Sequence, residues 1–226
     1  MAPARAACIA ESQAHTVALV ELYTSEHCAR CPVAERWLAR LAAGATPERV
    51  LPLELHTDYW EYFGSRDSRA ERRIANRHGR LSLLQRMALV DRPQVLLQGR
   101  DFQPWESRAF DDAVARINAR PARARLEVEI RSAAGAFAAG VRAEIDDPAQ
   151  RADAVLFMAA FERRQQGYLV QEWQGPFAVQ GGGRVEERRL ALLPGATPEA
   201  SGVAAFVQNR RTAEVLQAVL LPACSP

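Results

Sequence analysis

Residues 17–37 read VALVELYTSEHCARCPVAERW and contain the clearest pattern in the chain. The apolar run that ends at residue 23 predicts a buried strand over 15–23, and the apolar residues after Cys31 recur at helical spacing over 31–41. Cys28 and Cys31 therefore lie where a strand passes through a short loop into a helix. Backbone N–H groups and the dipole at a helix N-terminus stabilise a thiolate, so this layout predicts a reactive cysteine pair.

The composition is that of a globular protein. The chain has 226 residues, 48% of them apolar, and a formal net charge of +2. This length suits one large domain or two small ones. The basic residues are all arginine, and the arginine pairs alternate with acidic residues as on a solvated surface. We therefore expect no nucleic-acid partner. The apolar runs are too short to cross a membrane, and the oligomeric state stays open.

The first half of the chain alternates strands and helices. A second strand is predicted over 50–56, and a strand–helix–strand unit gives a right-handed crossover with parallel strands. The next elements are a helical stretch over 67–87 with a break at His78 and Gly79, a strand and hairpin over 93–102, and a helix over 105–120. We predict an N-terminal arm over 1–15 and an α/β domain over 16–121.

The pattern changes after Pro121. Short alternating segments recur between glycine, proline and asparagine turns, at 126–130, 137–141, 154–161, 184–193, 203–208 and 215–221. Regularly spaced short strands of this kind are typical of an antiparallel sandwich. We therefore predict an antiparallel β domain over 122–226, which makes the whole chain α+β.

A polar and aromatic stretch, residues 56–64, follows the second strand. Ligands of open α/β sheets bind outside the carboxyl ends of the strands, where the cysteine pair also lies. His56, Asp58 and Trp60 are therefore candidates for shaping the site, and His56 or Asp58 would carry a proton to or from Cys31. Alternatively, Asp58 caps the following helix and Trp60 packs at the rim of the core. We expect His15 and His78 to lie on the surface.

The ordered motifs resemble those of a bacterial family of secreted thioredoxin-like proteins that is classed as a domain of unknown function. The matching stretches are ELYTS at 21–25, CARCP at 28–32, HTDYW at 56–60 and PQ at 93–94. The resemblance covers essentially the whole chain. It implies a thioredoxin-like α/β domain, a β-rich C-terminal part and export from the cytoplasm, but it supplies no established reaction.

This chain departs from the family pattern near the cysteines. His27 replaces a glycine, Val33 and Glu35 replace a proline and an aspartate, and Asp91-Arg92 replaces Tyr-Thr.

The resemblance also implies roles near the cysteines. In thioredoxin-like folds a cis-proline faces the cysteine pair, and Pro93 occupies that place. The residue before that proline, here Arg92, helps to set redox behaviour and partner choice. The expected catalytic residues are thus Cys28 as the exposed attacking thiol, Cys31 as the buried resolving thiol, and Pro93.

The leading hypothesis is thiol–disulfide exchange with protein thiols or disulfides, without a cofactor. His27 and Arg30 flank the pair, and a nearby cation lowers a thiol pKa and makes the disulfide more oxidising. One alternative is a copper-handling protein, with His27 or His56 beside the cysteines. Metal binding is not the leading prediction, because no second C-x-x-C or H-x-x-x-H is present to complete a structural zinc centre. The other alternative is a non-catalytic binding module in which the pair is a structural disulfide.

The two remaining cysteines, Cys8 and Cys224, are predicted to form a structural disulfide between the N-terminal arm and the last strand. An even number of cysteines suits an oxidising compartment. Residues 1–7, MAPARAA, resemble the small-residue end of a signal peptide whose apolar part has been removed. These features predict a periplasmic or secreted protein.

Overall fold

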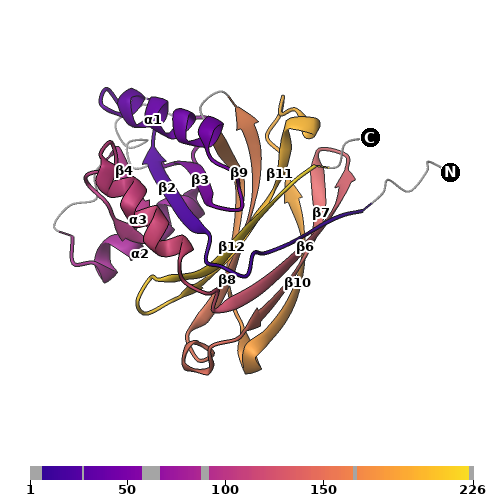
Figure 1. The fold of residues 1–226 in the computed structure, drawn as a ribbon. Coiled ribbons are helices and arrows are strands. Elements are labelled where there is room, and N and C mark those ends of the chain that lie inside the picture. The colour runs from indigo at the N-terminus through magenta and orange to yellow at the C-terminus, as the bar shows by residue number, and fades with distance from the viewer. Residues whose placement is uncertain (1–6, 27, 58–66, 88–91, 165–166, 224–226) are drawn as a thin grey trace.

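The computed structural model describes residues 7–26, 28–57, 67–87, 92–164 and 167–223. Within these ranges lie the helices α1 (Cys31–Gly44), α2 (Arg72–Leu84) and α3 (Arg108–Asn118). The strands are β1 (Cys8–Glu11), β2 (Ala18–Thr24), β3 (Val50–His56), β4 (Gln94–Leu97), β5 (Arg100–Asp101), β6 (Ala124–Ala133), β7 (Ala136–Ile145), β8 (Ala154–Arg164), β9 (Gly167–Ala178), β10 (Gly183–Ala191), β11 (Ser201–Asn209) and β12 (Val215–Pro222). The helices gather at one side of the molecule (Figure 1). The predicted α+β class is confirmed.

One large sheet runs through both halves of the chain. Its strand order is β12-β11-β8-β9-β3-β2-β4-β5. Strands β2 and β3 are parallel, as predicted, and β4 pairs antiparallel with β2. The two halves join where β3 pairs with β9, with Leu53 opposite Tyr168 and Glu54 opposite Leu169. The two parts of the chain on either side of Pro121, which the sequence predicted as separate domains, therefore share one sheet.

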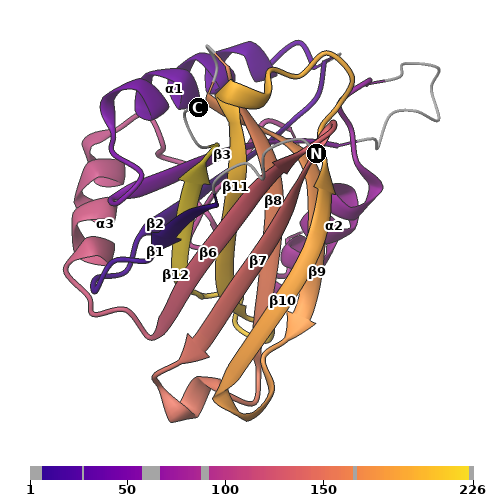
Figure 2. The same ribbon diagram turned by 90° about the vertical axis from the view of Figure 1, so that its right-hand side faces the viewer.

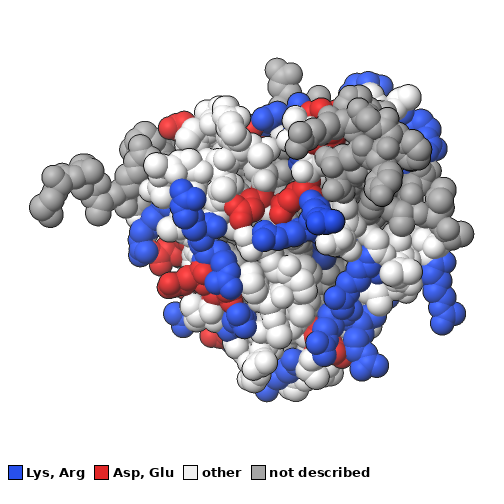
Figure 3. Space-filling view, turned by 180° about the vertical axis from the view of Figure 1, so that it is seen from behind, with Lys and Arg blue, Asp and Glu red and all other residues white. Residues whose placement is uncertain are grey.

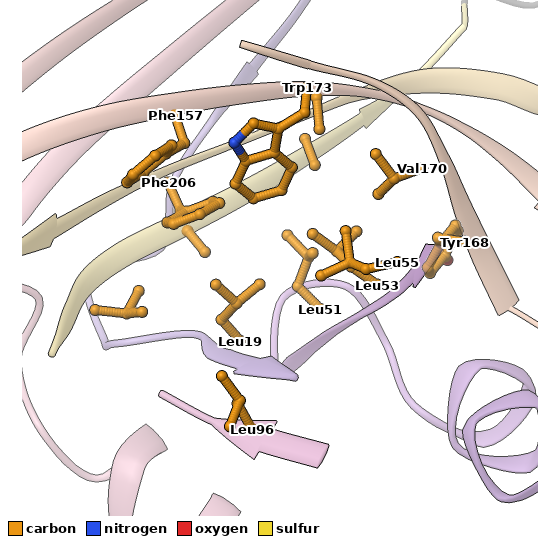
Figure 4. Close-up of a cluster of buried hydrophobic side chains, with 14 of the residues drawn as sticks. Leu19, Leu51, Leu53, Leu55, Leu96, Phe157, Tyr168, Val170, Trp173 and Phe206 are labelled. Carbon is orange, nitrogen blue, oxygen red and sulfur yellow. The ribbon is translucent and has the colours of Figure 1, made fainter. Parts of the chain in front are cut away.

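The two faces of β2 pack against different helices, because successive strand residues point to opposite sides of the sheet. Ala18, Val20 and Leu22 pack against α1 and α3, whereas Leu19 and Tyr23 lie in the core cluster that includes residues of α2. The cluster that contains Leu19 and Tyr23 also includes side chains from β3, β4, β8, β9 and β11, which meet on one face of the sheet (Figure 4). A continuous apolar core therefore spans the junction.

A second sheet, with strand order β1-β6-β7-β10, covers the other end of the large sheet. Its inner residues, among them Val128 and Val141, pack against Met158 and Val203 of β8 and β11. Figure 2 shows β6, β7 and β10 in front of these strands. Strand β1 comes from the predicted N-terminal arm and pairs antiparallel with β6.

Three details differ from the sequence prediction. Helix α2 continues unbroken through His78 and Gly79. His78 is fully buried rather than on the surface, because it faces the sheet and stacks on Tyr23 with ring centroids 4.0 Å apart. Strand β9 has no counterpart among the predicted strands, since Gln171, Glu172 and Gln174 interrupt its apolar pattern.

Candidate functional site

The cysteine pair lies at the start of α1, as predicted. Cys28 and Cys31 form a disulfide with their Cα atoms 5.3 Å apart. Cys31 is the first residue of the helix and fully buried, whereas Cys28 is half-buried. Pro32 occupies the first turn, where its missing N–H leaves no helical bond unmade. The Glu35 carboxylate accepts a hydrogen bond from Thr24 Oγ1 at 2.6 Å, which fixes α1 to the end of β2.

Arg30 connects this loop to the segment that precedes β4, and Arg92 connects that segment to the residue after β3. Arg30 Nη2 donates to the backbone oxygen of Arg92 at 3.1 Å. The Arg92–Pro93 peptide bond is cis. The Arg92 side chain is buried and donates from Nη1 to the backbone oxygen of Thr57 at 3.3 Å. The structure therefore brings Arg30 next to Arg92 and Pro93, although Arg30 and Arg92 are 62 residues apart in the sequence.

His56 lies at the end of β3 between two carboxylates. Its Nδ1 is 2.7 Å from Asp67 Oδ2, and its Nε2 is 2.8 Å from Glu54 Oε1. Burial alone would lower the pKa of His56, but the hydrogen bonds and charges of Asp67 and Glu54 outweigh it and raise the pKa to about 9. Asp67 Oδ2 also accepts from the backbone N–H of Glu26, at 2.9 Å. The triad thus ties the cysteine loop to β3, while a proton-transfer role for His56 stays a prediction.

This triad predicts a loss of stability in mild base. The folded-state pKa of about 9 lies above the ordinary 6.5, so the stabilisation is complete below pH 6.5 and disappears as the pH rises through 9. We expect the free energy of unfolding to fall by about 2 kcal/mol between roughly pH 7 and 9.5. Urea denaturation at several pH values measures this fall, which should be absent in His56→Gln. Equal pH slopes for the two proteins would contradict the assignment.

A second buried charged group, which the sequence analysis missed, lies on the α2 side of the sheet. Glu21 of β2 is completely buried, and its carboxylate accepts from Arg77 Nε at 2.7 Å and from Nη2 at 3.0 Å. The Arg77 guanidinium carbon lies 4.6 Å from the ring centroid of Phe157 and 5.0 Å from those of Trp173 and Phe206. The sequence did hold a signal for this pair, because a glutamate inside a buried strand needs a group that pairs with its charge.

Several predicted site residues fall outside the described part of the chain, namely His27, Asp58, Trp60 and Cys224. Cys8 is disulfide-bonded, and its pairing with Cys224 stays a prediction, because Cys224 lies outside the described residues. Within the described ranges, no cluster of His, Cys, Asp and Glu is arranged to hold a metal ion. In the same ranges, no helix is long and apolar enough to cross a membrane.

The basic side chains do not form a continuous strip on the face opposite the view of Figure 1. They gather there in separate groups, some with acidic side chains among them, around a broad uncharged area (Figure 3). Arg210 and Arg211, for example, both form ion pairs with Asp153, so a negative charge lies beside these two positive charges.

The fold and the site define an α+β protein with a C-x-x-C disulfide at the start of a helix that packs on a mixed sheet. The chain belongs to the family described as "Protein of unknown function (DUF1223)", whose model matches residues 19–172. This confirms the predicted membership of a family of unknown function. No curated protein matches the sequence.

Two solved structures share this fold. HBP35 of Porphyromonas gingivalis is similar with a TM-score of 0.68 and 14% identity, over 94% of this chain and 76% of that chain. Protein AGR_C_4864 from Agrobacterium tumefaciens is similar with a TM-score of 0.62 and 21% identity, over 95% of this chain and 98% of that chain. At these identities the likeness concerns the fold alone.

Proposed function

We propose that this protein exchanges disulfides with protein thiols through Cys28 and Cys31. The observation that carries the proposal is the unequal exposure of the two sulfur-bearing residues, half-buried Cys28 beside fully buried Cys31 at the start of α1. A partner can reach the first cysteine, while the second is held within one helical turn to break the mixed disulfide. The N-terminus of α1 favours a thiolate at this place.

The exchange is a two-electron transfer that needs only a partner dithiol. A partner thiolate attacks Cys28 Sγ, the Cys28–Cys31 bond breaks, and Cys31 leaves as a thiolate that takes up a proton. The second partner thiol, once deprotonated, attacks the mixed disulfide and releases Cys28. The partner is oxidised to a disulfide and the cysteine pair is reduced, and the reverse sequence reduces a partner disulfide.

Arg30 would favour the oxidising direction. Arg30 lies two residues after Cys28 in the sequence, and its guanidinium donates a hydrogen bond to the backbone carbonyl of Arg92. A cation near the pair stabilises the thiolate of the reduced form, which raises the reduction potential. In this proposal half-buried Pro93 and exposed Val33 contribute to the partner-binding surface, and buried Arg92 positions Pro93 from behind.

We also propose a thioredoxin-like character for the part that contains the cysteines, and a location outside the cytoplasm. The strand order β3-β2-β4-β5, with helices on both faces, supports the first. The disulfides at Cys8 and at Cys28–Cys31 support the second, because such bonds persist in oxidising compartments.

The reduction potential of the Cys28–Cys31 pair tests this function. Titration in glutathione buffers, with thiols counted by mass spectrometry, should give a potential of roughly −120 to −200 mV, the range of oxidising enzymes. A value below about −300 mV would identify an inert structural disulfide and favour a binding module instead.

Two matched variants test the division of roles. Reduced Cys31→Ser should form a mixed disulfide with oxidised glutathione at Cys28, and it should do so at least about tenfold faster than reduced Cys28→Ser does at the buried Cys31. Mass spectrometry over time measures both rates. Equal rates would contradict the assignment of Cys28 as the attacking thiol.

A further inference from the structure

We propose that the cavity between α2 and the large sheet binds a small aromatic carboxylate. The cavity measures about 380 Å³, within the range of small-molecule sites. Its walls come from α2, from β8 and β9, and from the end of β11 with the turn that follows. It lies on the opposite side of the sheet from α1 and Cys31, so the proposal is independent of the disulfide chemistry.

The charge of the lining indicates an anion. Four arginines line the cavity, Arg73, Arg77, Arg80 and Arg210, whereas none of its described lining residues is acidic. Buried Glu21 neutralises Arg77 from behind, and Asp153 pairs with Arg210 at 3.1 Å.

The other two arginines supply the excess charge. Arg73 Nη1 donates to the backbone oxygen of Trp173 at 3.1 Å and lies 3.6 Å from the nearest Glu71 oxygen, so its charge is only loosely paired. Arg80 forms no ion pair with any acidic residue that the structure describes. Both side chains are exposed at the mouth of the cavity. Arg80 and the remaining N–H groups of Arg73 are therefore available for a ligand carboxylate, to which arginine binds with paired N–H groups.

The remaining lining favours a planar apolar body. Phe157 and Trp173 line the inner wall (Figure 4), but they are only 6% and 1% exposed, and the buried Arg77 guanidinium lies 4.6 Å and 5.0 Å from their ring centroids. The planar surface that a ligand meets on this wall is therefore mainly the guanidinium. Leu81, Leu84 and Pro176 complete an apolar surface around the arginines. Aromatic rings pack well on such faces and on guanidinium planes. An anionic head beside an aromatic body therefore matches the two kinds of surface present.

The proposal is tested with 2-naphthoate as the probe and with neutral 2-naphthamide as its matched control. Calorimetric titration of the full chain with its disulfides intact should give a Kd of about 0.1–1 mM for the carboxylate, and at least about tenfold weaker binding for the amide. No binding of naphthoate at several millimolar, or equal binding of the two compounds, would overturn the proposal.

Three variants of α2 locate the site. Arg73→Gln and Arg80→Gln should each weaken naphthoate binding by roughly fivefold to tenfold, because each removes a charged hydrogen-bond donor. Arg72→Gln removes a neighbouring exposed arginine that does not line the cavity, so it should leave the Kd unchanged. Equal weakening by Arg72→Gln and Arg80→Gln would show a diffuse charge effect and refute the site. All three positions are exposed, so the variants should fold.

Discussion

Replacing Glu21 with glutamine should lower the free energy of unfolding by about 3–5 kcal/mol. The substitution keeps the size of the side chain but leaves the Arg77 guanidinium in the core without its counter-charge. The two side chains are only 0% and 5% exposed, so solvent cannot replace the lost partner. Urea denaturation at neutral pH measures the change.

A surface ion pair provides the control. Arg125 and Glu144 approach to 2.8 Å, but their side chains are 67% and 47% exposed. Glu144→Gln should therefore cost far less than Glu21→Gln.

A double variant separates burial from charge. Glu21→Gln with Arg77→Met should recover much of the loss, because no uncompensated charge remains and a thioether packs well against Phe157 and Trp173. If Glu21→Gln and Glu144→Gln cost the same, the buried pair does not have the role assigned to it.

Replacing Gly99 with alanine should cost about 3–5 kcal/mol, for two reasons that add. Gly99 has a φ of +74°, a conformation that alanine adopts only with strain. A Cβ atom there would also overlap the backbone oxygen of Ala213 and lie 2.6 Å from Gln208 Nε2. Gly99 lies in the turn between β4 and β5, and the loop it touches belongs to the second half of the chain.

Gly135 is the matched control for this substitution. Its φ is +62°, but a Cβ atom would meet nothing within 4 Å. Gly135→Ala should therefore show only the backbone cost of about 1–2 kcal/mol. Thermal or urea unfolding of both variants gives the difference. Similar losses for the two would mean that the contact between Gly99 and Ala213 is not a tight one.

The local elements were largely predictable, because they depend on periodicity and on glycine and proline. The predicted strand over 50–56 matches β3, and the cysteine pair was placed correctly at the start of α1. The pairing of β3 with β9 was not predictable, since nothing in either segment specifies a partner more than a hundred residues away. The polar residues of β9 also break the apolar pattern by which a strand is predicted from sequence.

The candidate site was predictable only in part. Motif order identified Cys28, Cys31 and Pro93, but the carboxylates of Glu54 and Asp67 that hold His56 were missed. The contact between Asp67 and His56 depends on the tertiary fold, whereas Glu54 lies two residues before His56 on the same face of β3 and could have been found from strand alternation. Glu21 and Glu54 illustrate the general lesson: a charge inside a strand that is otherwise apolar predicts a buried partner without naming it.

The shared sheet has a consequence for biosynthesis. The free edge of β3 is completed only by β9, and the Gln217 side chain in β12 bonds the backbone of Val17, His15 and Gln13. On the ribosome, the earlier half would wait on the order of 10 s for β9 to be made, at about 5–20 residues per second. During that time the strand edge is open to other chains. A protein of this topology should therefore depend on holding chaperones during synthesis more than its modest size suggests.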